Sequence, residues 1–195
     1  MRLFVAVYPP AAALSDLAAT VDRLRIGTAA AAGASVGLTA RPLWHVTLVF
    51  LGDVADERVP AAAEALAGAV DRWRSGSAPT PRLRLAGGGK FGRGRFTIMW
   101  VGLDGDVAGL RELARHVRRG MRHARFTFDD RRPLHPHLTI GRPGARLPAD
   151  DIEADLAALD RYRGPWWQVE AVHLVSSRPG PKPVYQSMST VSLDP

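Results

Sequence analysis

Two histidines, each followed two residues later by a threonine, are the residues whose types and spacing best suit chemistry. His45 and Thr47 lie in the first half of the chain, and His137 and Thr139 lie in the second half. Because side chains alternate between the faces of a strand, each histidine shares a face with its threonine. A polar face on a central strand costs free energy unless it lines water or a ligand. One such pair alone is typical of a core histidine, whereas two at matching positions favour a functional site.

Two imidazoles that face each other could act as one general base and one general acid near neutral pH. The two threonine hydroxyls could donate hydrogen bonds to the non-bridging oxygens of a phosphate group. This combination fits in-line displacement at phosphorus, with one histidine on the attacking oxygen and the other on the leaving oxygen.

The elements that must position these residues alternate between strands and helices. Hydrophobic periodicity predicts strands at 3–8, 44–51, 82–86, 95–103, 137–141, 168–176 and 184–193, and helices at 10–26, 56–73, 107–123 and 148–159. Alternation in the second strand directs Val46, Leu48 and Phe50 into the core. The glycine-rich segment between 86 and 95 is expected to be an exposed loop, and Phe4 and Trp100 are expected to be core residues.

The order β-α-β-α-β occurs twice along the chain. An offset of 92 residues places Phe4 on Phe96 and His45 on His137. This pattern predicts an α+β fold with duplicated halves, in which two antiparallel sheets face a central cleft. We see no flexible linker between the halves, so residues 1–195 are expected to form one bilobal domain.

Arginine carries the net charge of +7, because the chain contains only two lysines among 26 basic residues. The positive charge is concentrated in segments 82–95 and 111–132, each with a net charge of +5, and the remaining chain is at −3. A localised basic surface suits a polyanion such as RNA, although a solvated arginine face with no partner explains it equally well.

The chain resembles the two-histidine (2H) phosphoesterases, and more closely the bacterial and archaeal RNA 2′,3′-cyclic phosphodiesterases, also called 2′-5′ RNA ligases. The resemblance covers nearly the whole chain and is carried by the opening residues 2–6, the motif 44–53, the motif 132–142 and the late segment 174–177. The two histidine motifs are specific only in combination and at this separation.

This resemblance implies hydrolysis of RNA 2′,3′-cyclic phosphate ends to 2′-phosphates without a metal or cofactor. It implies that His45 is the proton donor and His137 the proton acceptor, and the shared strand faces then place Thr47 and Thr139 on the phosphate. Arg142 follows His137 by five residues, and whether it contacts phosphate is left open. The implied substrates are RNA with a cyclic end, including tRNA fragments, and nucleoside 2′,3′-cyclic phosphates. Two alternatives remain: a 2′-5′ RNA ligase or related cyclic nucleotide phosphodiesterase with the same site, and a non-catalytic RNA-binding module.

Other motifs carry less weight. Residues 87–92 match G-x-G-x-x-G, but a dinucleotide site needs a helix after this turn, and a strand is predicted there. His135 and His137 could form a metal-binding pair, yet no partner ligands at suitable spacing are evident, so no metal is expected. The chain has no cysteine, which excludes disulfides and thiolate metal sites.

No apolar run approaches the roughly 20 residues that span a bilayer. The N-terminal apolar run is short and ends in Tyr8-Pro9-Pro10, which favours a strand over a signal peptide. We therefore expect a cytoplasmic monomer with no membrane partner.

Overall fold

The computed structural model describes residues 1–76, 79–129, 131, 133–178, 180 and 183–194. The helices are α1 (Ala11–Arg23), α2 (Arg25–Ala31), α3 (Val59–Ser75), α4 (Val107–His123) and α5 (Ala149–Asp160). The strands are β1 (Arg2–Val7), β2 (Val46–Asp53), β3 (Arg82–Phe91), β4 (Ile98–Gly105), β5 (Leu138–Gly141), β6 (Trp167–Gln168), β7 (Ala171–Arg178) and β8 (Val184–Ser192). No helix in these ranges is both long and apolar enough to cross a membrane.

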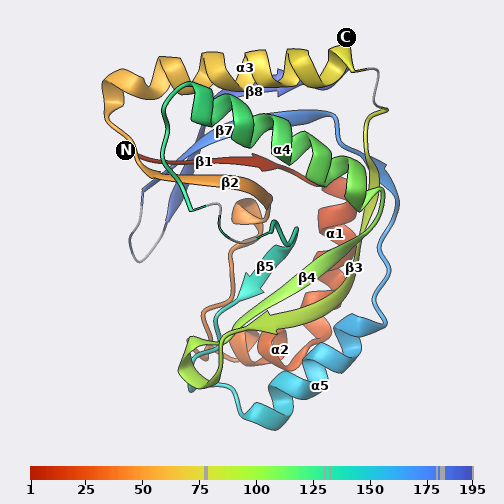
Figure 1. The fold of residues 1–195 in the computed structure, drawn as a ribbon. Helices are drawn as coiled ribbons and strands as arrows, with labels where there is room; N and C mark the ends of the chain where they lie inside the picture. The colour runs from red at the N-terminus through yellow and green to blue at the C-terminus, as the bar shows by residue number, and fades with distance from the viewer. Residues whose placement is uncertain (77–78, 130, 132, 179, 181–182, 195) are drawn as a thin grey trace.

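The strands form one antiparallel sheet in the order β6-β3-β4-β5-β2-β1-β7-β8, so the fold is α+β as expected. The sheet curls at its centre, where β2 meets β5 through the pair Val46 and Leu138 (Figure 1). We call β2, β1, β7 and β8 the first lobe, and β5, β4, β3 and β6 the second lobe. The two expected sheets are therefore continuous with each other through this central pair.

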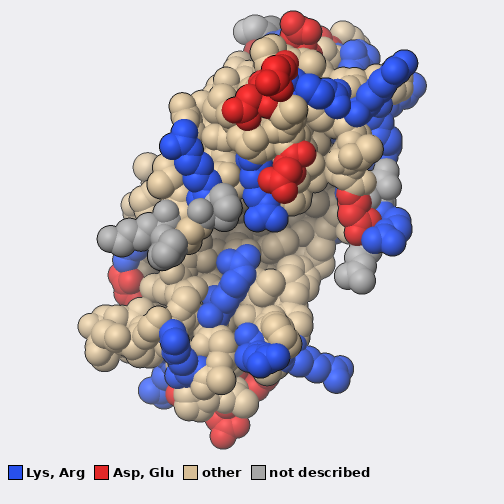
Figure 2. All heavy atoms as spheres, turned by 90° about the vertical axis from the view of Figure 1, so that its left-hand side faces the viewer, with Lys and Arg blue, Asp and Glu red and all other residues tan. Residues whose placement is uncertain are grey.

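Helices cover both lobes, and the core between helices and sheet is continuous. Helices α3 and α4 pack on each other and lie along the first lobe, whereas α5 packs on β3 and α2 in the second lobe (Figure 1). One buried cluster includes residues from both lobes, such as Leu3 and Val46 in the first and Leu83 and Leu138 in the second. The molecule is hollowed between the lobes, and basic side chains gather around this hollow (Figure 2).

The third strand of each predicted half lies beside the other half. Strand β3 pairs with β4, and β7 pairs with β1. The central partners Val46 and Leu138 are themselves 92 residues apart, as a twofold relation between the lobes requires. The 92-residue offset does not relate Phe96 to the buried Phe4 of β1, however. Phe96 lies in a 3-10 turn outside β4 and its side chain is 68% exposed. The duplication itself stays a prediction.

The glycine-rich segment is not a loop as expected, because β3 runs through it to Phe91. A bulge at Ala86 and Gly87 opposite Gly102 lets the strand continue. A Cβ at Gly88 would overlap Leu159 of α5, and one at Gly89 would overlap the Trp100 ring. The glycines therefore allow close packing on both faces of β3, which periodicity alone did not reveal.

The helix predicted at 10–26 is two helices, because Leu24 has an extended backbone between α1 and α2. The backbone N–H groups of Arg25 and Ile26 donate to the carboxylate of Asp155, at 2.6 and 2.9 Å. Asp155 is 2% exposed, lies on α5, and so caps a helix far from it in sequence. The strand predicted at 168–176 is likewise divided, since β6 pairs with β3 and β7 with β1.

We expect Asp155→Ala to lower the free energy of unfolding by about 1–3 kcal/mol, because one buried and one partly buried N–H donor lose their acceptor. Chemical denaturation measures this change. Glu64→Ala, at an exposed position on α3, is the control and should alter stability by less than about 0.5 kcal/mol. Equal stability of the two variants would contradict the capping role of Asp155.

Candidate active site

The structure holds the His45 ring by its Nδ1 atom at the start of β2. Nδ1 lies 2.7 Å from the carbonyl oxygen of Leu43, which can only accept a hydrogen bond, so Nδ1 carries the proton. The other nitrogen, Nε2, lies 3.0 Å from the hydroxyl oxygen of Thr47. The ring stacks on Phe4 with 4.7 Å between centroids and meets Tyr185 edge-on at 5.4 Å. Nε2 is therefore the ring nitrogen without a backbone partner.

His137 is held in the same way at the start of β5. Its Nδ1 lies 2.8 Å from the carbonyl oxygen of His135, so Nε2 is again the nitrogen without a backbone partner. The His137 ring lies beside the rings of Phe91 and Trp100, with 4.9 Å and 6.1 Å between the ring centroids. His135 contributes a main-chain acceptor, which agrees with a positioning role for it.

The central strand pair brings the two motifs together. Val46 faces Leu138 in the antiparallel register, and both side chains are fully buried. Extending this register by one residue in each direction sets His45 across from Thr139 and Thr47 across from His137. All four polar side chains therefore lie on the face opposite the core, as the sequence predicted.

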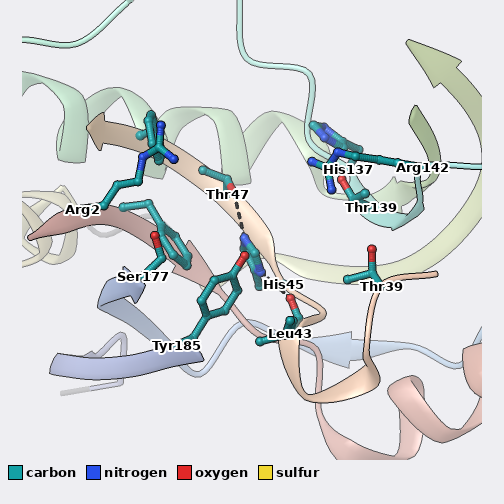
Figure 3. A pocket seen from close by; sticks show the side chains of 12 residues that line it. Arg2, Thr39, Leu43, His45, Thr47, His137, Thr139, Arg142, Ser177 and Tyr185 are labelled. Atoms are coloured by element: carbon teal, nitrogen blue, oxygen red, sulfur yellow. Dashed lines mark hydrogen bonds between the residues drawn. The ribbon is translucent and has the colours of Figure 1, made fainter. Parts of the chain in front are cut away.

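These four residues and Arg142 line one cavity of about 470 Å³ (Figure 3). His45 and Thr47 enter it from the first lobe, whereas His137, Thr139 and Arg142 enter from the second (Figure 3). All five candidate residues from the sequence thus meet in one place, including Arg142, for which contact with phosphate stays a prediction. Arg132 of the second motif lies outside the described residues. The catalytic roles stay predictions.

The cavity suits an anion. Among the described residues that line it, Arg2 and Arg142 are basic and none is acidic. Neither arginine has a salt bridge to a described carboxylate; Arg2 lies over the Phe50 ring, with 5.2 Å from its guanidinium carbon to the centroid. A phosphate group in the cavity would therefore meet two cations and several hydroxyls without a carboxylate to repel it.

Burial lowers the pKa of both imidazoles, His45 and His137, below the usual value of 6.5. The hydrogen bonds to the Leu43 and His135 carbonyls oppose this effect. Proximity to His137 further lowers the pKa of His45, and His135 and Arg142 further lower that of His137. Both rings are therefore neutral near pH 7 in the free protein, and a bound anion would favour protonation of one of them.

Sequence reasoning missed part of the cavity lining. Phe50 was expected in the core, yet it is 48% exposed and lines the cavity. Leu48 has no partner in the pairing of β1 with β2, and this bulge reverses the faces of the residues that follow it in β2. Phe4 is buried as expected but also supports His45, and Trp100 is only half-buried. Arg2 could have been found, since Leu3, Val5 and Val7 alternate onto the core and leave Arg2 and Phe4 on the other face.

Four further lining residues were not predicted as site residues: Thr39, Leu43, Ser177 and Tyr185. Leu43 directly precedes the first motif and Ser177 ends the late segment of the resemblance, so these two lay within reach of the sequence. The buried Trp44 indole donates to the carbonyl of Thr39 at 3.1 Å and so fixes one edge of the cavity. Burial raises the pKa of Tyr185, which keeps its hydroxyl protonated as a donor. In the described part of the chain, no group of three or more His, Asp or Glu residues is arranged to hold a metal ion.

We expect Arg142→Ala to raise the pKa of His137, because a positive charge that disfavours the imidazolium form is removed. An NMR titration of the imidazole signals measures this shift. Arg146→Ala is the matched control, since the Arg146 guanidinium donates to the Ser35 carbonyl and lies outside the cavity lining. An unchanged His137 pKa in the Arg142 variant would contradict the proximity of the two groups.

Comparison with known proteins identifies the family of the chain. The family model described as the 2′-5′ RNA ligase superfamily matches residues 13–181. A Geobacillus stearothermophilus protein named RNA 2′,3′-cyclic phosphodiesterase is 41% identical over 100 residues, which cover 51% of this chain and 30% of that protein. The matched part thus spans less than a third of this relative.

Two solved structures share the fold over almost their whole length. A Thermus thermophilus protein superposes with a TM-score of 0.68 and 28% identity, covering 99% of this chain and 98% of the other. Escherichia coli LigT in complex with 3′-AMP superposes with a TM-score of 0.68 and 21% identity, covering 100% and 98%. The resemblance seen in the sequence is confirmed at the level of family and fold: the chain belongs to the 2′-5′ RNA ligase superfamily.

Proposed function

We propose that this protein hydrolyses 2′,3′-cyclic phosphate ends of RNA to 2′-phosphates by general acid–base catalysis, without a metal ion. The observation that carries the proposal is the pair of imidazoles, each anchored through Nδ1 to a carbonyl and each presenting Nε2 to one basic cavity. The name of the Geobacillus stearothermophilus relative supports the same activity.

In the proposed reaction, water attacks the phosphorus atom in line with the 3′-oxygen. His137 Nε2 takes the proton of the attacking water, and the P–O3′ bond breaks. His45 Nε2, protonated in the reactive state, gives its proton to the departing 3′-oxygen. An alkoxide is a poor leaving group, so this second transfer should supply much of the rate.

The remaining lining residues would hold the phosphate during displacement. The hydroxyls of Thr47 and Thr139 and the guanidinium of Arg142 would donate to the non-bridging oxygens as negative charge is redistributed. Thr47 contacts His45 Nε2 in the free protein, so the substrate oxygen would take its place. The bound anion would also raise the pKa of His45 and so produce the acid form that burial disfavours.

A ligation reaction is a second candidate, favoured by the family match. If a 5′-hydroxyl takes the place of water, the same proton transfers yield a 2′-5′ phosphodiester and a free 3′-hydroxyl. RNA is the substrate class of both candidates, and product analysis distinguishes a 2′-phosphate from a 2′-5′ junction.

We expect His45→Ala to lose about 10²–10⁴-fold in turnover of a 2′,3′-cyclic phosphate. It should regain much of that rate when the bridging 3′-oxygen is replaced by sulfur, because a thiolate leaves without protonation. His137→Ala should show no such rescue, since the attacking water still needs a base. Turnover is measured in excess chelator, and His123→Ala, exposed on α4, is the control.

The reverse pattern of rescue would exchange the two roles, and equal rescue of both variants would contradict separate roles. Loss of wild-type turnover in chelator, restored by added metal, would contradict the metal-independent mechanism.

A further inference from the structure

We propose that the open face of the β3–β4 hairpin binds the single-stranded RNA chain that leads away, on its 5′ side, from the cyclic phosphate. The proposal rests on the proposed function, because it takes the terminal phosphate to be held between His45 and His137. We call this surface the hairpin track and define it by the following residues: Trp100, Arg111, Arg84, Arg163, Arg82 and Trp166.

The hairpin track begins beside the catalytic cavity. Trp100 of β4 pairs with Thr139 of β5, so their side chains lie on the same face of the sheet. The Trp100 ring also contacts the His135 ring, with 4.7 Å between centroids. A chain whose last phosphate occupies the cavity would therefore pass Trp100 first.

The next part of the hairpin track is a hollow with a glycine floor. This hollow has a volume of about 230 Å³, and Gly87, Gly88 and Gly102 line it together with Trp100 and Arg111. Arg111 is exposed on α4 and has no salt bridge to a described carboxylate. The bare floor gives a polynucleotide room to approach the sheet backbone closely, while Arg111 provides a cation at its edge.

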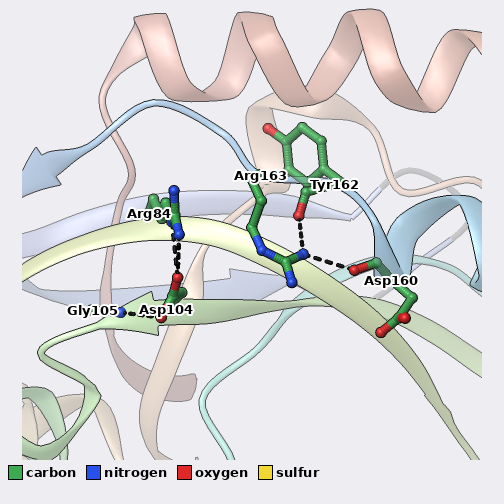
Figure 4. Close-up of polar contacts among 6 residues, drawn as sticks. All are labelled: Arg84, Asp104, Gly105, Asp160, Tyr162 and Arg163. Atoms are coloured by element: carbon green, nitrogen blue, oxygen red, sulfur yellow. Dashed lines mark hydrogen bonds and ion pairs between the residues drawn. The ribbon is translucent and has the colours of Figure 1, made fainter.

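The far end of the hairpin track combines arginines with an exposed indole. Trp100, Gly102 and Asp104 alternate along β4, so their side chains share one face of the strand. The Arg84 guanidinium donates two hydrogen bonds to the Asp104 carboxylate, at 2.6 and 2.9 Å (Figure 4). The guanidinium of Arg163 donates to the backbone carbonyls of Asp160 and Tyr162 and has no hydrogen bond to a carboxylate of the described residues (Figure 4).

Trp166 closes the hairpin track. Its ring is approached by the guanidinium carbons of Arg82 at 5.3 Å and Arg84 at 4.5 Å. The side chain is 44% exposed, although its neighbour Trp167 is buried in the core. An exposed indole that holds two guanidinium groups near its face offers both stacking and positive charge to a nucleotide.

The charge and spacing fit a single-stranded polyanion. The hairpin track has four arginines; the carboxylate of Asp104 is paired with Arg84, and Asp160 lines the glycine-floored hollow. At a strand rise of about 3.3 Å per residue, Trp100 and Asp104 lie about 13 Å apart, which exceeds the length of one nucleotide. Aromatic platforms combined with a basic groove are how proteins bind single strands with little sequence preference.

The opposite end of the hairpin is a poorer path. Phe96 is exposed there and Arg95 lies over its ring at 4.8 Å, so it resembles the Trp166 end chemically. The cavity beside this turn, however, includes no residue that contacts either catalytic histidine ring, and its Lys90 is paired with Glu153. Phe96 and Arg95 therefore serve as matched controls.

The test compares kcat/KM for a nucleoside 2′,3′-cyclic phosphate with kcat/KM for a ladder of short oligoribonucleotides with the same end. We expect wild-type kcat/KM to rise with length. Trp166→Ala and Arg82→Ala should each reduce kcat/KM for the longer substrates. The reduction should be about tenfold for Trp166→Ala, which removes a stacking platform. Both variants should leave the nucleoside substrate unaffected, and Trp166→Phe should retain most of the length effect.

Three outcomes would overturn the proposal: no length effect in the wild type, a loss in the Trp166 and Arg82 variants that is the same for the nucleoside, or an equal loss in Phe96→Ala and Arg95→Ala. If no substrate turns over, the proposed function fails. The hairpin track is then tested by binding of a fluorescent single-stranded oligoribonucleotide, which Trp166→Ala should weaken and Phe96→Ala should not. Equal binding by these two variants would overturn it.

Discussion

The pairing of Val46 with Leu138 is the constraint on which the rest of the structure depends. Both side chains are buried, and this pair joins the two lobes of the sheet. Because neighbouring strand residues face opposite sides, burying this pair directs His45 and His137 out of the core together. The same pairing that connects the lobes thus forms the cavity between them, and a one-residue slip of either strand would turn the imidazole of that strand toward the core.

Local pattern was enough to predict the candidate site, because that site is made from short motifs on central strands. Alternation identified His45 and His137, and the predicted helix 107–123 coincides with α4, where the Asp106 carboxylate accepts from the Gly109 N–H. Features that depend on distant partners were not predictable in this way. The break at Leu24 depends on Asp155 of α5, and the exposure of Phe50 depends on a bulge between two strands. Tyr185 reaches the cavity through pairing of the last strand alone.

The glycine-rich segment shows how the same residues can suggest different chemistry in sequence and in structure. A run of glycines before a lysine resembles a phosphate-binding loop, but the run lies inside β3 and meets Leu159 and Trp100 on its two faces. Its lysine, Lys90, pairs with Glu153. The arginines that line the cavity lie elsewhere in the fold, namely Arg2 in β1 and Arg142 directly after β5.

Protonation connects this geometry to the proposed chemistry, and the pH dependence of kcat/KM tests the account most directly. One imidazole must be neutral and the other charged, so we expect a bell-shaped profile for a 2′,3′-cyclic phosphate. Burial lowers the pKa values of both imidazoles in the free protein. The apparent pKa on the alkaline limb of the kcat/KM profile should therefore lie below the usual histidine value of 6.5. The alkaline limb of kcat should lie at higher pH, because the bound anion stabilises the charged form of His45. A profile that stays flat from acidic to alkaline pH would contradict the two-histidine mechanism.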